Sequence, residues 1–333
     1  MNRLSRRDFL KTLSTILGTV FVEQFLTACG QRNGSLVTEL PILPTTQTIA
    51  VPSPETDSNS LASTPDLVVV RNGEPEELVR QALNPLGGIG SFVPKDAYVI
   101  IKPNICTSYH TYEYAATTNP WVIGELVRQC FSAGAKKVQV MDYPFGGSAE
   151  EAYMKSGIEE QVKTAGGEMV VMPQMKFLPT EIPDGRDLHR LNIYDDVLKA
   201  DVLINVPIAK HHSRARLTLS MKNLMGVITL RPFMHRNLGQ RIADLSSRIR
   251  PTLTVIDAVR ILVDNGPGGG NLADVKKIDT LIVSPDFVAA DSFATTLFGL
   301  NPEDIDYIKA GADMGLGRSQ LSDLRIEEIN LGT

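Results

Sequence analysis

The sequence is poor in cysteine, and this shortage excludes some classes of cofactor site. Three cysteines, Cys29, Cys106 and Cys130, occur in 333 residues, and no two of them form a Cys-x-x-Cys pair. A cysteine-ligated iron–sulfur cluster or a zinc knuckle needs closely spaced thiolates, so neither is expected. Whether Cys106 and Cys130 pair with each other stays open, because sequence does not give the distance between them.

Long apolar runs and blocks of basic charge are also missing beyond the first thirty residues. No later segment offers the roughly eighteen apolar residues in a row that a membrane-spanning helix needs. The net charge of -5 is mildly acidic, so nucleic acid is not an expected partner. The hydrophobic fraction of 43% is ordinary for a folded globular chain.

The N-terminal segment has the order of features typical of an export signal. Residues 5–11, Ser-Arg-Arg-Asp-Phe-Leu-Lys, resemble a twin-arginine signal, and an apolar run follows from Leu13 to Val22. Residues 26–29, Leu-Thr-Ala-Cys, resemble a bacterial lipobox, which implies cleavage and a lipid on Cys29. We expect an extracytoplasmic protein held to a bacterial membrane by lipid alone. The alternative is an N-terminal amphipathic helix of a soluble protein.

The rest of the chain divides into a tether and a folded part. Residues 30–65 are rich in Pro, Ser and Thr and have few apolar residues, so they cannot bury enough surface to offset their ordering entropy. Residues 66–333 are long enough for one large domain.

Short apolar segments alternate with helical patterns throughout residues 66–333. This alternation predicts an α/β fold with a mainly parallel sheet and helices on both faces. Residues 167–197 are less regular and are expected to form a small antiparallel extension. Strands are expected at 67–70, 98–101, 138–141, 202–206, 252–256 and 280–283, and helices at 75–83, 119–133, 149–164 with a break near Gly157, 238–249 and 286–298.

Polar residues follow directly on four of these expected strands. In a parallel α/β sheet the carboxyl ends of the strands share one edge, and ligands bind beyond that edge. The residues concerned are Lys102-Pro103-Asn104, Asp142, Lys210-His211-His212 and Asp257.

His211 and Lys210 are the first candidates for catalysis. Two adjacent imidazoles cannot point the same way from an extended chain, and we expect His211 to enter the site as a general base or metal ligand. Lys210 and Lys222 would bind anionic groups of a substrate, although Lys222 could also be a lysine whose stem covers apolar surface.

Asp291 stands out through helical periodicity. Phe287, Asp291, Ala294 and Phe298 recur on one apolar stripe, so the carboxylate must find a partner. The sequence leaves two roles open for Asp291, a structural ion pair or a carboxylate of the site. Asp286 is expected to be an N-cap. The remaining candidates are Lys102, Asn104, Asp142, Asn223 and Arg231 for substrate, with His211, His235 and Asp257 for a metal ion.

Several blocks of the chain resemble the family named "domain of unknown function 362" over nearly all of residues 66–320. Its activity is unsettled, and some members carry an appended ferredoxin-like cysteine cluster that this chain does not have. The blocks are Lys102-Pro103-Asn104, residues 133–136, residues 201–207, Lys210-His211-His212, residues 221–226, residues 255–258, residues 265–267, residues 288–291 and residues 315–317.

Two hypotheses about function follow. The first is an extracytoplasmic, lipid-anchored enzyme that acts on a small anionic substrate, with a metal ion as a candidate cofactor. The second is a non-catalytic lipoprotein that binds a small molecule or a metal for a partner. Both place the ligand at the same edge of the sheet, so the sequence does not separate them.

Overall fold

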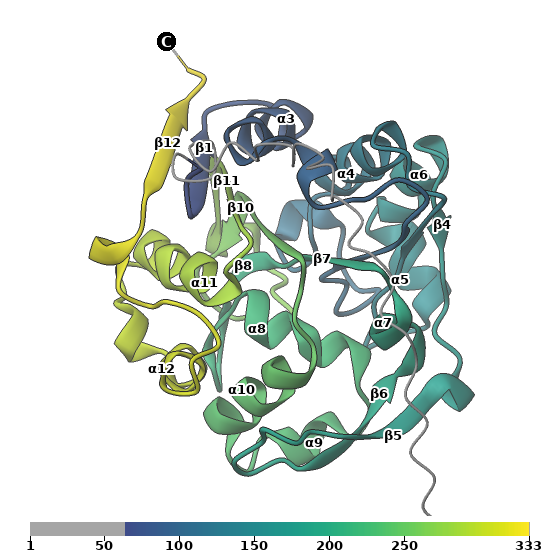
Figure 1. Cartoon of the computed structure of the whole chain (residues 1–333), viewed down its shortest axis with the longest axis vertical. Helices are drawn as coiled ribbons and strands as arrows, with labels where there is room; N and C mark the ends of the chain where they lie inside the picture. The colour runs from purple at the N-terminus through teal and green to yellow at the C-terminus, as the bar shows by residue number, and fades with distance from the viewer. Residues whose placement is uncertain (1–63, 333) are drawn as a thin grey trace, which may run out of the picture. The chain divides into compact units, whose positions relative to one another are not determined.

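The computed structural model describes residues 64–332, which contain every folded element predicted above. The signal peptide predicted at 1–29 and nearly all of the tether predicted at 30–65, with Cys29, lie outside the described residues. The described part is a mixed α/β structure around one ten-stranded, mostly parallel sheet (Figure 1).

The main sheet has the strand order β12-β1-β11-β10-β7-β2-β3-β4, with β8 and β9 joined to it through β10. Strand β11 runs against β1 and β10, β9 runs against β8, and the other pairs are parallel. The strands are β1 (Leu67–Arg71), β2 (Tyr98–Pro103), β3 (Lys137–Val140), β4 (Glu168–Met169), β7 (Val202–Val206), β8 (Ile208–His212), β9 (Arg216–Thr218), β10 (Leu253–Leu262), β11 (Val275–Ser284) and β12 (Ile326–Asn330).

Helices cover both faces of the sheet, as predicted. The first half of the domain supplies α3 to α6 to one face and the second half supplies α7 to α12 to the other. Side chains alternate along the strands, so Val68 and Val70 pack under the first layer while Leu67 and Val69 pack under the second. The helices are α3 (Pro75–Leu83), α4 (Pro120–Ser132), α5 (Ala149–Lys155), α6 (Ile158–Thr164), α7 (Asp195–Lys199), α8 (Ser220–Asn223), α9 (Arg231–Met234), α10 (Leu238–Arg248), α11 (Phe287–Thr295) and α12 (Asp306–Asp313).

Local capping explains where several of these helices begin. The Asn119 side chain accepts a hydrogen bond from the Trp121 amide at the start of α4, and Pro120 occupies the first turn. Asp286 caps α11 in the same way through the amides of Val288 and Ala289, as predicted. Gly157, in the left-handed conformation, separates α5 from α6 at the predicted break.

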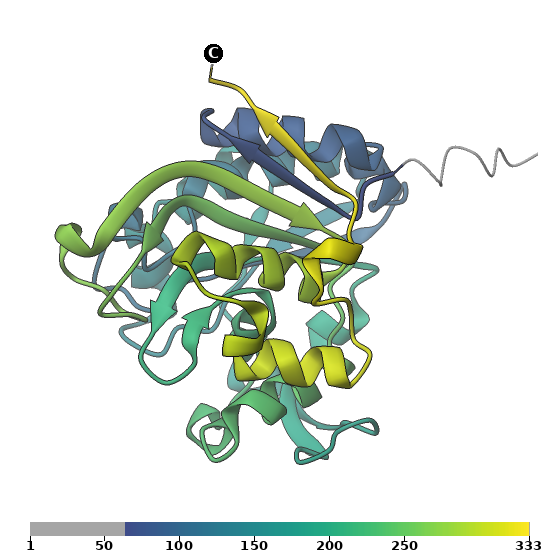
Figure 2. The same cartoon turned by 90° about the vertical axis from the view of Figure 1, so that its left-hand side faces the viewer.

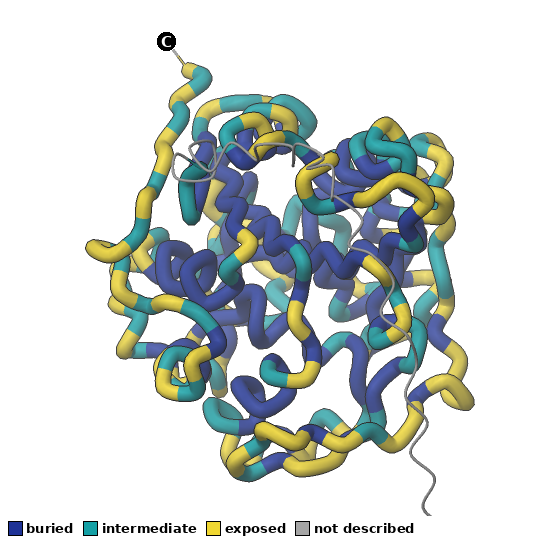
Figure 3. Tube along the Cα trace, in the orientation of Figure 1, coloured by how far each residue is buried: buried dark blue, intermediate teal, exposed yellow. Residues whose placement is uncertain are grey.

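The antiparallel extension predicted within 167–197 is present as a separate two-stranded sheet of β5 (Phe177–Glu181) and β6 (Arg190–Tyr194). Buried backbone gathers in the main sheet and on the facing sides of the helices, while the loops around them are exposed (Figure 3). Within residues 64–332, no helix is both long and apolar enough to cross a membrane.

Strands β10 and β11 are much longer than predicted, β1 and β2 extend one and two residues beyond their predicted ends, so that Lys102 and Pro103 belong to β2, and one predicted loop is a strand. Strands β10 and β11 have ten residues each and curve together as a long hairpin (Figure 2). Because β10 continues past the end of β7, residues 208–212 pair with it as β8 instead of forming a loop. For the same reason Asp257 lies inside β10, where we expected it to follow the end of a strand.

Candidate functional site

A small cavity lies where β2 and β3 end, next to α8, and is called the carboxyl-end cavity below. Its volume is about 60 Å³, and roughly 10–15 Å³ is needed to hold one water molecule. The cavity therefore has room for a few water molecules or for a small ligand. It is lined by Asn104, Ile105, Cys106, Asp142, Tyr143, Phe145, His212, Thr218, Lys222, Asn223, Met225, Gly226, Arg231 and Pro267.

A buried ion pair supports the wall of the cavity that Asp142 lines. Lys102 Nζ donates to Asp142 Oδ1 at 2.8 Å, and both side chains are almost completely buried. The other Asp142 oxygen accepts from the Ile105 amide at 2.5 Å, so the carboxylate is well satisfied. Burial lowers the pKa of Lys102, and the charge of Asp142 opposes that shift.

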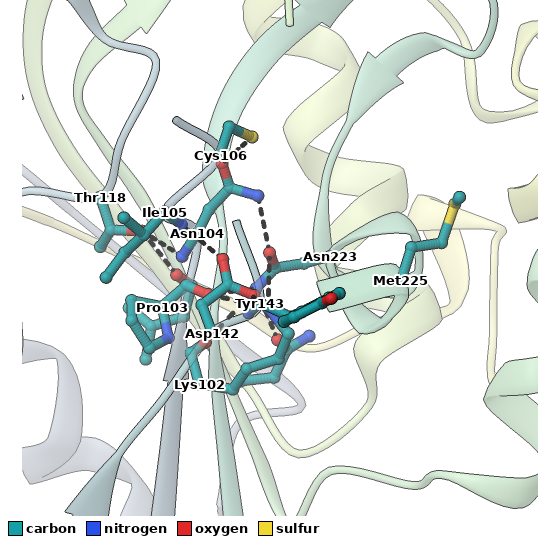
Figure 4. A network of polar contacts seen from close by, with 12 residues as sticks. Lys102, Pro103, Asn104, Ile105, Cys106, Thr118, Asp142, Tyr143, Asn223 and Met225 are labelled. Atoms are coloured by element: carbon teal, nitrogen blue, oxygen red, sulfur yellow. Dashed lines mark hydrogen bonds and ion pairs between the residues drawn. The ribbon is translucent and has the colours of Figure 1, made fainter. Parts of the chain in front are cut away.

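Three amide side chains connect this ion pair to the neighbouring elements. Two of them, Asn104 and Asn223, are labelled in Figure 4. Asn223 Oδ1 accepts from Lys102 Nζ at 3.1 Å and from Asn104 Nδ2 at 2.8 Å. Asn223 Nδ2 donates to Asn205 Oδ1 on β7 at 2.8 Å. The network ties the ends of β2 and β7 to α8, so it fixes the position of α8 against the sheet.

Lys210 reaches the same network from β8 and is fully buried. Its Nζ donates to Asn104 Oδ1 at 2.8 Å and to the carbonyl oxygens of Ala116 and Pro267 at 2.6 and 3.0 Å. It also lies 3.1 Å from Cys106 Sγ. Lys210 does not line the cavity but holds residues that do.

Lys222 and Thr218 are buried in the cavity wall with unused hydrogen-bonding capacity. Among the described residues, Lys222 Nζ has no carboxylate partner, and it donates to Met225 Sδ at 3.7 Å. Burial and the nearby charges of Lys210 and Arg231 lower the pKa of Lys222 to about 8. Thr218 is 3% exposed, and its hydroxyl has no hydrogen-bond partner within residues 64–332. In the part of the chain that the structure describes, the Lys222 ammonium therefore has only a thioether partner at the cavity, and the Thr218 hydroxyl has none.

Arg231 closes another side of the cavity from α9. Its Nε donates to the Met225 carbonyl at 2.8 Å, and an Nη atom donates to the Tyr143 carbonyl. The guanidinium also lies 5.1 Å from the centre of the Tyr143 ring. With Lys222, Arg231 gives the cavity wall a positive charge, and the carboxylate of Asp142, which also lines the cavity, is already paired with Lys102.

The imidazole in the cavity wall is that of His212, and His211 lies outside. His212 Nδ1 accepts from the amides of Arg214 and Ala215, so a neutral ring carries its proton on Nε2. Burial and the charges of Lys222 and Lys210 lower the pKa of His212 to about 3. His211 Nδ1 accepts from the Gly266 amide at 3.0 Å, and His211 borders a second cavity of about 530 Å³ that shares His212.

Asp291 does not reach the carboxyl-end cavity, but it holds the start of α8. Its oxygens accept from the amides of Ser220 and Met221 at 2.6 and 2.9 Å. The carboxylate thus positions the short helix that carries Lys222 and Asn223. Burial raises the pKa of Asp291 to about 8, although both amides oppose the shift.

The predicted metal ligands are not brought together. Asp257 is buried in β10, where its oxygens accept from the amides of Asn119 and Val259, and burial raises its pKa to about 6. His211, His235 and Asp257 share no cavity. In the part of the chain that the structure describes, no group of three or more His, Cys, Asp or Glu side chains could hold a metal ion.

Cys106, His212 and Thr218 are among the cavity residues that the sequence did not predict. Cys106 is free, as is Cys130, which is buried in the core, so the two do not pair in this structure. The sequence does contain a signal for His212. Side chains two positions apart on a strand share a face, and Lys210 is a predicted site residue. No sequence signal marked Thr218.

A curated relative resembles most of the chain. A thylakoid-associated protein of Synechocystis sp., sll1697, is 26% identical over 253 residues, which cover 72% of this chain and 74% of the relative.

Solved structures give more distant matches. Lactate racemase apoprotein from Thermoanaerobacterium thermosaccharolyticum is 13% identical with a TM-score of 0.42, over 66% of this chain and 54% of that one. A protein from Thermotoga maritima is 12% identical with a TM-score of 0.37, over 68% of this chain and 60% of that one. The chain thus spans less than two thirds of each of these two structures.

The model of one protein family matches residues 99–296, well over half of the chain. These residues include β2, β3, β7, β8 and α8, which build the carboxyl-end cavity. The chain belongs to the family described as Domain of unknown function (DUF362).

Proposed function

We propose that this protein is an enzyme that binds a small anionic substrate, a carboxylate of a few carbon atoms, in the carboxyl-end cavity. The observation that carries the proposal is the buried Lys222 ammonium, which lines the cavity without a carboxylate partner. A buried charge without a partner is costly, and an anionic ligand would compensate it. The size of the cavity supports a ligand of a few heavy atoms.

The groups around the cavity supply binding and proton transfer. Lys222, the Thr218 hydroxyl and Arg231 are donors for a carboxylate. Lys222 is also the group suited to move a proton, because its pKa of about 8 lies near neutral pH. These roles replace the one that the sequence suggested for His211, which faces another cavity.

Calorimetric titration of the full chain with malonate tests the proposal. We expect saturable binding that Lys222→Met weakens by roughly tenfold or more, because a hydrogen bond to a charged group contributes about 1.5–3 kcal/mol. Thr218→Val should also weaken binding, while Thr218→Ser should keep it. Lys136→Met, which removes an exposed lysine, is the matched control. Binding that Lys222→Met leaves unchanged would contradict the proposal.

Turnover separates the enzyme from the alternative, a non-catalytic binding protein. A panel of small carboxylates, followed by proton magnetic resonance, should reveal a reaction that is lost in Lys222→Met and kept in Lys136→Met. Malonate binding with no turnover across the panel would favour the binding protein.

We also propose that the protein is an extracytoplasmic lipoprotein, exported by a twin-arginine signal and anchored through Cys29. The support is the order of signal, apolar run and lipobox in residues 1–29. The Synechocystis relative is described as thylakoid-associated, which is in line with a location at a membrane. Cys29→Ser should abolish lipidation and release the protein or stop its processing. A variant that fractionates and migrates like the wild type would contradict this location.

A further inference from the structure

Cys106 places a thiol in the wall of the carboxyl-end cavity. It is free and partly exposed, and its Sγ lies 3.1 Å from the buried Lys210 Nζ. The thiol also donates to Asn104 Oδ1 at 3.2 Å. Lys210 is held by two carbonyl oxygens and by Asn104, so its ammonium is fixed beside the sulfur. The Lys210 ammonium is therefore placed to stabilise, through a charge-assisted hydrogen bond, negative charge that develops on the sulfur when it reacts.

The rest of the cavity supports a ligand next to this sulfur. Lys222 is 8% exposed, lines the same cavity and has no carboxylate partner among the described residues. Thr218 contributes a buried hydroxyl that has no hydrogen-bond partner within residues 64–332. Lys222 and Thr218 would hold the anionic end of a ligand close to Cys106.

We propose that Cys106 is the nucleophile of the carboxyl-end cavity and attacks an electrophilic carbon of a small carboxylate held by Lys222. The inference rests on the proposed function, since it takes the same ligand class in the same cavity. The sulfur reacts as the thiolate, after its proton has passed to solvent. A carbon–sulfur bond forms with the sulfur electron pair, and the bond from that carbon to the leaving group breaks. The leaving group departs with the electron pair of the broken bond.

Cys130 is a control within the same chain. It lies in the core under α4, and burial raises the pKa of its thiol to about 12. Burial denies it access to a ligand, so it should stay unmodified in the folded protein.

Alkylation of the folded full chain with iodoacetate and with iodoacetamide tests the proposal. The two reagents differ in charge, and mass spectrometry of peptides assigns the modified cysteine. For each reagent the rate at Cys106 is compared with the rate at the same cysteine in the chain unfolded in urea. We expect the iodoacetate-to-iodoacetamide rate ratio at Cys106 to be roughly fivefold or more higher in the folded protein, from one nearby positive charge.

Lys222→Met should lower the iodoacetate rate more than the iodoacetamide rate, and Lys136→Met should change neither. Malonate should protect Cys106 from both reagents. Cys106 that is unreactive, or that shows the rate ratio of the unfolded chain, would overturn the inference.

The calorimetric titration distinguishes the two failures. If malonate binds but Cys106 shows no preference for iodoacetate, the nucleophile is wrong and the binding site stands. If malonate does not bind and the preference is absent, both proposals fail.

Discussion

Lys102 and Asp142 form a buried ion pair with a nitrogen–oxygen distance of 2.8 Å, and Gly226 packs directly against it. A Cβ on residue 226 would lie 1.9 Å from Asp142 Oδ1 and 2.4 Å from Lys102 Nζ. Residue 226 must therefore be a glycine, because a side chain at this position would overlap the ion pair. The two charges come from the ends of neighbouring strands, β2 and β3, and they anchor the wall of the carboxyl-end cavity.

Gly226→Ala should destabilise the protein because the added methyl group overlaps both charged atoms. We expect a loss of about 1–3 kcal/mol in the free energy of unfolding, typical of overpacking. Gly90→Ala is the matched control, since a Cβ there meets no atom within 4 Å. Urea denaturation of the two variants measures the difference, and equal stabilities would contradict the close approach.

Asp142→Asn should cost about 3–5 kcal/mol of stability, because it leaves the Lys102 ammonium buried without its counter-charge. The double variant with Lys102→Met should cost less than the sum of the two single variants, since it removes both charges together. A double-mutant cycle from urea denaturation tests this. Strictly additive effects would show that the pair contributes no coupling energy.

Asp291→Ala should lower stability by about 1–3 kcal/mol, because the amides of Ser220 and Met221 lose their acceptor. It should also weaken malonate binding, since the helix α8 that carries Lys222 loses its attachment. The exposed Asp313 gives a matched control in Asp313→Ala. Unchanged malonate affinity in Asp291→Ala would limit the role of this carboxylate to stability.

Malonate affinity should fall as the pH rises above about 8, the pKa of Lys222. Below that pH the side chain is an ammonium and attracts the carboxylates, and above it the neutral amine does not. Calorimetric titrations between about pH 6.5 and pH 9.5 measure the change, a window that brackets this pKa. An affinity that stays constant across the window would assign anion binding to Arg231 or to another group.

The protein should lose stability in acid through His212. Its pKa is about 3 in the folded protein and 6.5 when unperturbed, so between these values the unfolded chain binds a proton that the folded protein does not. The stabilising contribution is complete above pH 6.5 and is lost as the pH falls toward 3, by up to about 1.4 kcal/mol per pH unit. His212→Gln should flatten the acid side of the stability curve, and His189→Gln, at an exposed position, should leave it unchanged.

The sequence determined most of the architecture because its local signals agree with the final fold. Continuous apolar segments such as 202–206 became buried parallel strands, and capping residues such as Asn119 and Asp286 begin the helices where predicted. The position of polar residues after strands also identified Lys102, Asn104 and Asp142, which meet at one edge of the sheet. These signals depend on short-range periodicity and on the common direction of parallel strands.

Only the tertiary structure decided which of the candidates share a cavity. His211 and His212 differ by one position on β8, and pairing with β10 turns His212 into the cavity and His211 out of it. Asp291 binds backbone amides of α8 instead of a ligand, and the Thr218 hydroxyl lines the cavity without a hydrogen-bond partner among the described residues. Strand register and long-range packing set these contacts, and neither is encoded in the local pattern of residue types.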